Sequence, residues 1–158
     1  MHCSFRNAKT GVSMTVTTAD AYVARAKAIA TTAHEGQFDK LGAAYIDHPR
    51  RVSERLNDPL EQATAWLHDV LEDSDFTRHD LLEAGIPGGV VEAVSVLTRT
   101  DAVSDADYYA GIRANPIALA VKRADIADNL EPWRVEQLDV SMQERLAAKY
   151  GAALAALD

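Results

Sequence analysis

Residues 66–73 read Trp66-Leu67-His68-Asp69-Val70-Leu71-Glu72-Asp73, and this stretch decides the fold and points to its chemistry. An imidazole beside a carboxylate is a metal-binding pair, and two more carboxylates follow one helical turn later. On a helix the polar residues spread over one side, and the apolar set Leu60, Ala63, Trp66, Leu67, Val70 and Leu71 lies on the other. Burying so many polar groups together is costly unless a cation binds there. A solvated polar face is the alternative.

Length and composition limit the class of protein. A chain of 158 residues with 47% hydrophobic and 25% charged residues is typical of one globular domain with a real core. No stretch approaches the about 20 apolar residues of a membrane span. Residues 1–13 lack the apolar segment of a secretory signal. The single cysteine, Cys3, excludes an internal disulfide framework and indicates a cytoplasmic protein.

The charge balance restricts the partners. A net charge of −8 argues against nucleic acid as the main partner, because phosphate contacts need clustered Lys and Arg. A small phosphorylated substrate is compatible with this charge, since a bound divalent cation reverses the local sign. Few basic residues lie near the motifs, namely Lys40, Arg50, Arg51, Lys122 and Arg123. That number suits a nucleotide better than a duplex.

Helical spacing recurs along the chain, and no segment shows the period-two alternation of a strand. The sequence therefore predicts an all-α fold. Helices are expected over residues 19–34, 47–56, 59–73, 78–85, 87–98, 105–113, from 116 to at least 129, and 141–157. We expect one domain over 17–158, preceded by a loose polar tail at 1–16.

Capping signals mark several helix starts. Asp58 before Pro59 is a cap with proline at the first helical position. Thr77 with Asp80, and Ser141 with Glu144, have the spacing of capping boxes. The last helix is rich in alanine, and it could serve either a homo-oligomer interface or only the core.

Four motifs together carry a family resemblance. They are AHEGQ at 33–37, YIDHP at 45–49, LHDVLED at 67–73 and VKRADIADN at 121–129. In this order and spacing they resemble the hydrolase domain of RelA/SpoT homologues, which are HD-superfamily metal phosphohydrolases, and especially the single-domain small alarmone hydrolases. The resemblance implies a single-domain HD-type helical bundle with a buried metal site. Four motifs in sequence are far more specific than any one of them.

The resemblance supplies a hypothesis for the metal site. One divalent metal would be bound by His48, His68, Asp69 and Asp125. Two imidazoles and two carboxylates form a mixed shell that suits Mn²⁺, Fe²⁺, Co²⁺ or Zn²⁺ better than Mg²⁺ or Ca²⁺. The family points to Mn²⁺. The remaining positions would be left for water and substrate.

The resemblance also assigns roles in catalysis. Glu72 and Asp73 match the acidic pair with which the family orients and deprotonates the attacking water. Glu72 follows His68 by one turn, so it can reach a metal-bound water without being a ligand.

Other residues match the family's substrate contacts. Lys40 matches a lysine that neutralises phosphate, Tyr45 a tyrosine of the same loop, and Asn129 an asparagine near the sugar or phosphates. Lys122 could hold Asp125 or meet a phosphate. We expect Asp128 to support Asn129 or Lys122.

One departure affects the substrate. Where many alarmone hydrolases have an arginine that stacks on guanine, this chain has Asp39, which cannot stack and repels phosphate. The leading expectation is metal-dependent hydrolysis of the 3′-pyrophosphate of (p)ppGpp-like alarmones of guanosine or adenosine, releasing pyrophosphate. The alternative is an HD-type phosphomonoesterase acting on other nucleotides or phosphorylated metabolites. A non-catalytic nucleotide-binding sensor ranks third.

Overall fold

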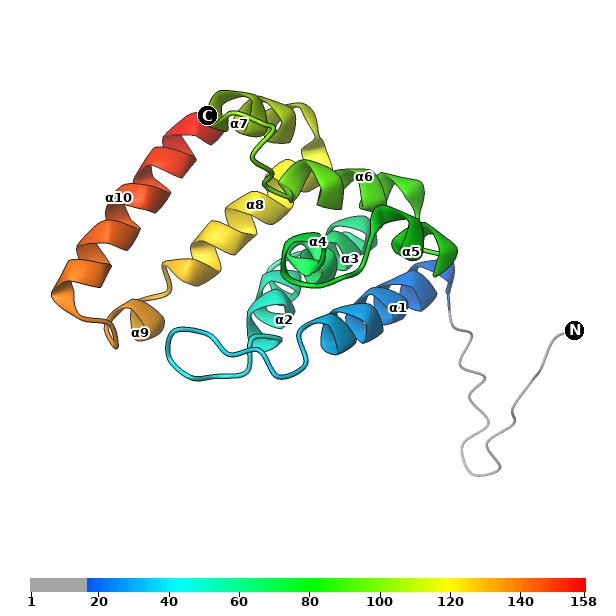
Figure 1. The fold of residues 1–158 in the computed structure, drawn as a ribbon, viewed down its shortest axis with the longest axis horizontal. Helices are drawn as coiled ribbons and strands as arrows, with labels where there is room; N and C mark the ends of the chain where they lie inside the picture. Colours follow the sequence, from blue (N-terminus) through cyan, green and yellow to red (C-terminus); the bar gives the residue numbers. More distant parts are fainter. Residues whose placement is uncertain (1–16) are drawn as a thin grey trace, which may run out of the picture.

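The computed structural model describes residues 17–158, and these residues form helices and no β-strand (Figure 1). An isolated bridge pairs Phe38 with Ala44. The helices are α1 (Thr18–Ala33), α2 (Asp47–Glu54), α3 (Pro59–Leu67), α4 (Val70–Asp73), α5 (Arg78–Glu83), α6 (Gly88–Leu97), α7 (Asp105–Ala114), α8 (Pro116–Asn129), α9 (Pro132–Val135) and α10 (Val140–Leu157). The all-α prediction is confirmed. The expected tail at 1–16, with Cys3, lies outside the described residues.

Helix α3 lies at the centre of the bundle. It contacts α1, α2, α6 and α8, and its residues 63–67 are all buried. Small residues in this run, such as Ala63 and Ala65, let the neighbouring helices approach closely. Burial of a side chain such as Leu67 contributes about 1.5–3 kcal/mol relative to leaving it exposed. The packing of α2 and α8 on α3 thereby brings His48, His68 and Asp125 close together.

Two apolar clusters fill the bundle. One joins α1, α3, α5 and α6, around Leu67, Leu81 and Val90. The other joins α7, α8 and α10 to α2, α3 and α6, and Tyr150 and Leu157 of α10 belong to it. Helix α10 therefore packs on the core, and whether it also forms an oligomer interface stays a prediction. No helix of the described residues combines the length and the apolarity that crossing a bilayer demands.

The helix expected over 59–73 is interrupted in the middle of its motif. Helix α3 ends at Leu67, and α4 begins only at Val70. The Nδ1–H of His68 donates to the carbonyl of Ala65 at 2.6 Å, the acceptor that the Asp69 N–H would use in a continuous helix. The prediction of one continuous helix was wrong, because the His68 side chain takes a backbone acceptor.

Helix starts agree with the sequence in most places. Thr77 forms the predicted capping box with Asp80, and the Asp58 side chain caps α3. The box predicted at Ser141 was wrong, since Asp139 accepts the N–H of Met142 and starts α10 earlier. The short helix α9 was not predicted.

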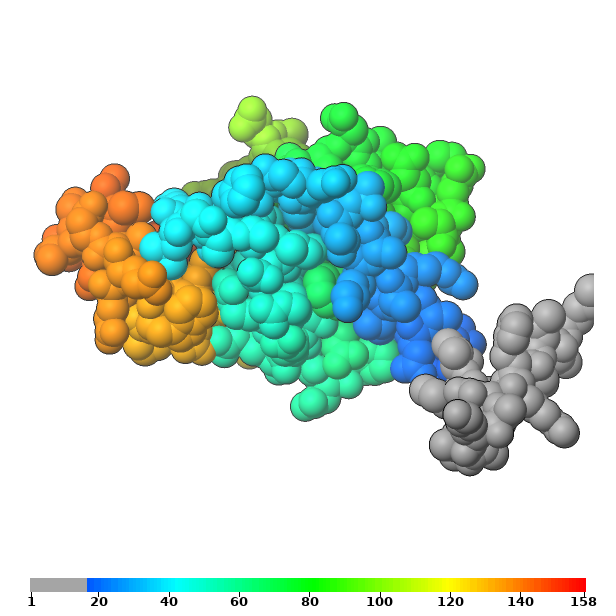
Figure 2. All heavy atoms as spheres, turned by 90° about the horizontal axis from the view of Figure 1, so that it is seen from below, coloured from blue at the N-terminus to red at the C-terminus, as the bar shows by residue number. Residues whose placement is uncertain are grey.

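The segment between α1 and α2 is a loop. It turns at Gly36 and Gly42, where φ is +75° and +82°, a region that glycine adopts at no steric cost. Figure 2 shows this loop, in blue to cyan, along the lower face from α1 to the orange segment around α9. The loop therefore reaches across the molecule to the C-terminal helices.

Candidate functional site

Three helices bring two imidazoles and a carboxylate together. His48 comes from α2, His68 follows the end of α3, and Asp125 comes from α8. Each offers a ligand atom within 4.8 Å of the others, and all three residues are buried. Nε2 of His48 lies 2.9 Å from Oδ1 of Asp125, and Nε2 of His68 lies 3.6 Å from the same oxygen. The arrangement has the residue types and spacing of a metal site.

Both imidazole rings are held by their other nitrogen. Nδ1–H of His68 donates to the Ala65 carbonyl, and Nδ1 of His48 lies 2.7 Å from Oδ2 of Asp128. Each ring therefore presents Nε2 to Asp125. Nε2 of His68 is buried and makes no hydrogen bond with any described residue. Such an unused nitrogen, aimed at a carboxylate, fits a divalent cation.

Asp69 lies beside this group and is not one of its three members. Its Oδ2 is 3.1 Å from Nε2 of His68 and accepts a hydrogen bond from the Tyr45 hydroxyl. Burial would raise the pKa of Asp69, but the adjacent His68 outweighs it and lowers the pKa to about 2. Asp69 is therefore held as a carboxylate within reach of the same point.

The cluster forms part of the wall of a cavity of about 450 Å³. Of the predicted site residues, the cavity wall includes Lys40, Tyr45, His48, His68, Asp69, Glu72, Lys122, Asp125 and Asn129. Asp73 is not among its lining residues. The volume is in the range of small-molecule sites. One cavity thus contacts nine of the ten residues that the sequence singled out.

The two members of the predicted acidic pair have different surroundings. Glu72 lines the cavity, and its carboxylate accepts the backbone N–H of Arg99. Burial raises the pKa of Glu72, against the opposing effect of that hydrogen bond. The backbone carbonyl of Asp73 accepts a hydrogen bond from Gln37 at 2.9 Å. Adjacent helical positions point about 100° apart, which separates the two carboxylates.

Two residues of α8 hold Asp125. Nζ of Lys122 lies 3.2 Å from Oδ2, and Nδ2 of Asn129 donates to Oδ1 at 3.1 Å. Burial lowers the pKa of Lys122, but Asp125 outweighs it and the net pKa is raised. Lys122 therefore stays charged, and the structure agrees with the expectation that it holds Asp125. Because it also lines the cavity, a phosphate contact stays a prediction.

Asp39 is folded into its own loop. Its Oδ1 accepts the backbone N–H groups of Leu41 and Ala43, at 2.9 and 3.0 Å. Its Oδ2 lies 3.5 Å from Nη2 of Arg134. This carboxylate shapes the loop next to Lys40 and forms part of the cavity wall.

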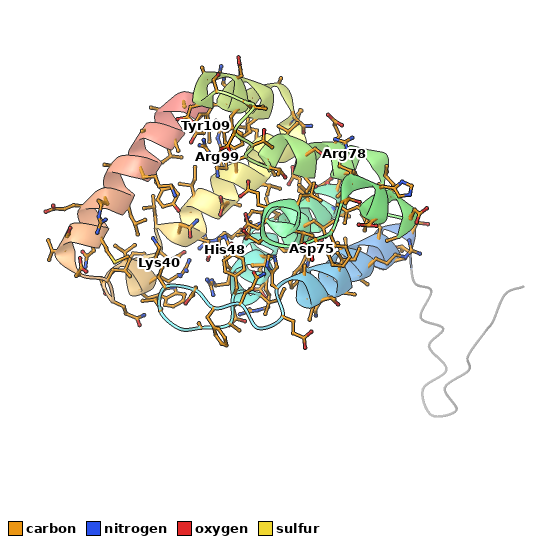
Figure 3. The ribbon with its side chains drawn as sticks, in the orientation of Figure 1. Lys40, His48, Asp75, Arg78, Arg99 and Tyr109 are labelled. Carbon is orange, nitrogen blue, oxygen red and sulfur yellow. The ribbon has the colours of Figure 1, made fainter. Side chains whose placement is uncertain are left out.

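The sequence did not single out several residues of this region. The cavity is also lined by Arg99, Tyr108, Tyr109, Arg134, Lys149 and Tyr150. In Figure 3, Arg99 and Tyr109 lie at the α7 end of the molecule, and Lys40 lies at the end near α9. The adjacent Tyr108 and Tyr109, on a helix with an acidic first turn, could have marked α7 as part of a site. The position of Arg134 could not be predicted, because it lies on α9, which the sequence did not predict.

The expectation for Asp128 was wrong. It bonds neither Asn129 nor Lys122, and instead contacts His48 and Arg51 of α2 and Arg134 of α9. Its side chain therefore lies between α8, α2 and α9.

Comparison with known proteins finds similar curated proteins and similar solved structures, while no family model matches. Guanosine-3′,5′-bis(diphosphate) 3′-pyrophosphohydrolases of Vibrio cholerae and Haemophilus influenzae are 39% and 38% identical over 77 residues. The match covers 46% of this chain and 11% of each relative. The chain is therefore similar to a small part of those proteins.

One similar solved structure is that of a metazoan ortholog of SpoT that hydrolyzes ppGpp and plays a role in starvation responses. It superposes with a TM-score of 0.68 at 21% identity, over 87% of this chain and 85% of that chain. At this identity the comparison shows a shared fold. The similarity to RelA/SpoT-type hydrolases that the motifs predicted is confirmed by the sequence matches, and the helical bundle is shared with this structure.

Proposed function

We propose that this chain is a metal-dependent phosphohydrolase that removes the 3′-pyrophosphate of (p)ppGpp-like alarmones. The observation that carries the proposal is the buried His48, His68 and Asp125 cluster in the wall of a cavity of about 450 Å³. Basic side chains line the same cavity, including Lys40, Arg99 and Lys149, in a chain with a net charge of −8. The names of the curated relatives support the choice of reaction.

One divalent ion, for which we propose Mn²⁺, would be held by His48, His68, Asp69 and Asp125. The mixed nitrogen and oxygen donors favour a transition metal over Mg²⁺ or Ca²⁺. Such an ion, when bound, supplies Lewis-acid polarisation of a phosphoryl oxygen and lowers the pKa of water. Lys122 and Asn129 keep Asp125 in its position.

In this proposal Glu72 is the general base. It lines the cavity one turn after His68, and burial raises its pKa towards the range in which a base works well. The water oxygen bonds to the phosphorus attached to O3′, and Glu72 accepts the water proton. The P–O3′ bond breaks, and the ribose oxygen leaves and takes up a proton from solvent, to which Glu72 releases the one it accepted. The products are pyrophosphate and a nucleotide with a free 3′-hydroxyl.

The other proposed residues bind or orient. Lys40 would neutralise a phosphate, and Tyr45 holds Asp69 while facing the cavity. Asn129 and Lys122 would contact the sugar or a phosphate from the α8 side. Asp73 would assist Glu72 from outside the cavity wall.

A second candidate is a phosphomonoesterase acting on other nucleotides, and Asp39 favours it. A carboxylate at the cavity wall next to Lys40 weakens the attraction for a highly anionic alarmone. A metal-binding nucleotide sensor without turnover is less well supported, because Glu72 has the placement of a base.

Product analysis decides among these candidates. Mn²⁺-loaded protein would be given guanosine and adenosine 3′-pyrophosphorylated nucleotides, and separately ordinary mono- and triphosphates. His68→Ala is the control, because it removes a proposed ligand. Pyrophosphate from the alarmones supports the proposal, orthophosphate from ordinary nucleotides supports the second candidate, and binding without any product supports the sensor.

A further inference from the structure

We propose that Asp128 is the positioning residue of the metal site: it orients His48 and thereby sets the affinity for the metal. The inference rests on the proposed metal site but not on the identity of the substrate. It concerns a residue that does not line the cavity, so Asp128 acts through His48 and not on the substrate.

Asp128 is the meeting point of three helices. Its Oδ2 accepts Nδ1–H of His48 at 2.7 Å, and its Oδ1 accepts Nε–H of Arg51 at 2.8 Å. Nη2 of Arg51 and Nη1 of Arg134 each lie 3.1 Å from Oδ2. The Asp128 side chain is fully buried. A carboxylate in such a place is stable only with this complete set of donors.

The imidazole bond is not needed to neutralise the carboxylate. Two guanidinium groups, from Arg51 and Arg134, already offset the charge of Asp128. The bond from His48 has a different consequence, since it leaves the proton on Nδ1 and frees Nε2 to face Asp125. A carboxylate on the far nitrogen also makes an imidazole a better ligand.

The His68 imidazole is held in the same way, through Nδ1, but by a weaker acceptor. Nδ1–H of His68 donates to the neutral carbonyl of Ala65, whereas His48 has a charged partner. His48 is therefore the histidine whose orientation and donor strength depend on a single side chain. Arg134, which contacts Asp128, also lies 3.5 Å from Asp39. The loop that carries Asp39 and Lys40 is therefore joined to His48 through Arg134 and Asp128.

The test measures Mn²⁺ affinity of metal-free protein by titration calorimetry, with the metal alone as the probe. Asp128→Ala should weaken binding towards the upper end of the about 10–100-fold range typical of such partners, because His48 loses its acceptor. Asp128→Asn should weaken it by about 10-fold, because an amide oxygen still accepts the bond but carries no charge. Asp128→Asn keeps the side-chain volume, so its Mn²⁺ affinity tests the proposal even if the alanine variant does not fold.

Val90→Ala is the control for a general loss of stability, since Val90 is fully buried on α6 and does not line the cavity. It should bind Mn²⁺ like the wild type. Saturating Mn²⁺ should restore the kcat of Asp128→Asn, because Asp128 does not face the substrate.

Wild-type affinity in Asp128→Asn would overturn the proposal, as would an equal weakening in Val90→Ala. A wild-type protein that binds no Mn²⁺ would overturn the metal site together with this inference. A protein that binds Mn²⁺ in the predicted order of variants but leaves alarmones intact would support the role of Asp128 and refute only the proposed substrate.

Discussion

Replacing Glu72 by glutamine separates the chemistry from metal binding. The glutamine Oε1 can still accept the backbone N–H of Arg99, so the contact between α4 and the segment after α6 is kept. The variant loses only the ability to take a proton from water. General-base catalysis typically contributes about 10²–10⁴-fold, so kcat should fall by that factor. This corresponds to about 2.7–5.4 kcal/mol in the barrier.

Mn²⁺ affinity should stay at the wild-type value in Glu72→Gln, because Glu72 is not a member of the buried ligand group. Pyrophosphate release gives kcat, and titration calorimetry gives the affinity. Glu92→Gln is a matched control, since Glu92 is an exposed carboxylate on α6 paired with Arg78. Retention of more than about a tenth of kcat in Glu72→Gln would refute the role of base. Loss of Mn²⁺ would show instead that Glu72 is a ligand.

Two further substitutions test the cavity wall and the core. Asp39→Asn keeps an oxygen for the loop amides but removes the charge and its pairing with Arg134, so KM should fall by about two- to five-fold with kcat unchanged; steady-state kinetics that show a higher KM would mean that the charge assists binding. Leu81→Ala empties a fully buried position on α5 and should lower the free energy of unfolding by about 2–5 kcal/mol, with the activity of the folded protein intact. Urea titration measures the free energy of unfolding of Leu81→Ala. A decrease below about 1 kcal/mol would show that the core collapses around the gap.

Local signals predicted those helix starts at which the sequence offers one clear cap. Asp58 before Pro59, and Thr77 with Asp80, meet that condition. At the last helix the sequence offers two possible N-caps, Asp139 and Ser141. Asp139 is the cap in the structure, and its side chain accepts the backbone N–H of Met142. Spacing alone does not rank two adjacent caps.

The break after Leu67 could not be predicted from periodicity. The polar residues of 68–73 have a helical spacing with or without the interruption. The break coincides with the hydrogen bond from the His68 ring to the Ala65 carbonyl, which helical spacing does not predict.

The ligands were accessible from the sequence because they lie in recognisable motifs, but their supports were not. Asp128 and Asp125 are three residues apart on α8, and the sequence does not say which residues of α2 and α9 face each. The folding of Asp39 into its loop likewise depends on the glycine turns and on Arg134. Tertiary contacts, and not local preference, decide both positions.

Removal and return of the metal test whether pyrophosphate release depends on a bound divalent ion. Protein stripped with a chelator would be given guanosine 3′-pyrophosphorylated nucleotide, and pyrophosphate would be measured before and after addition of one equivalent of Mn²⁺. The stripped protein should release no pyrophosphate, and release should return once Mn²⁺ is restored. Release that is unaffected by stripping, or orthophosphate as the product, would contradict this expectation.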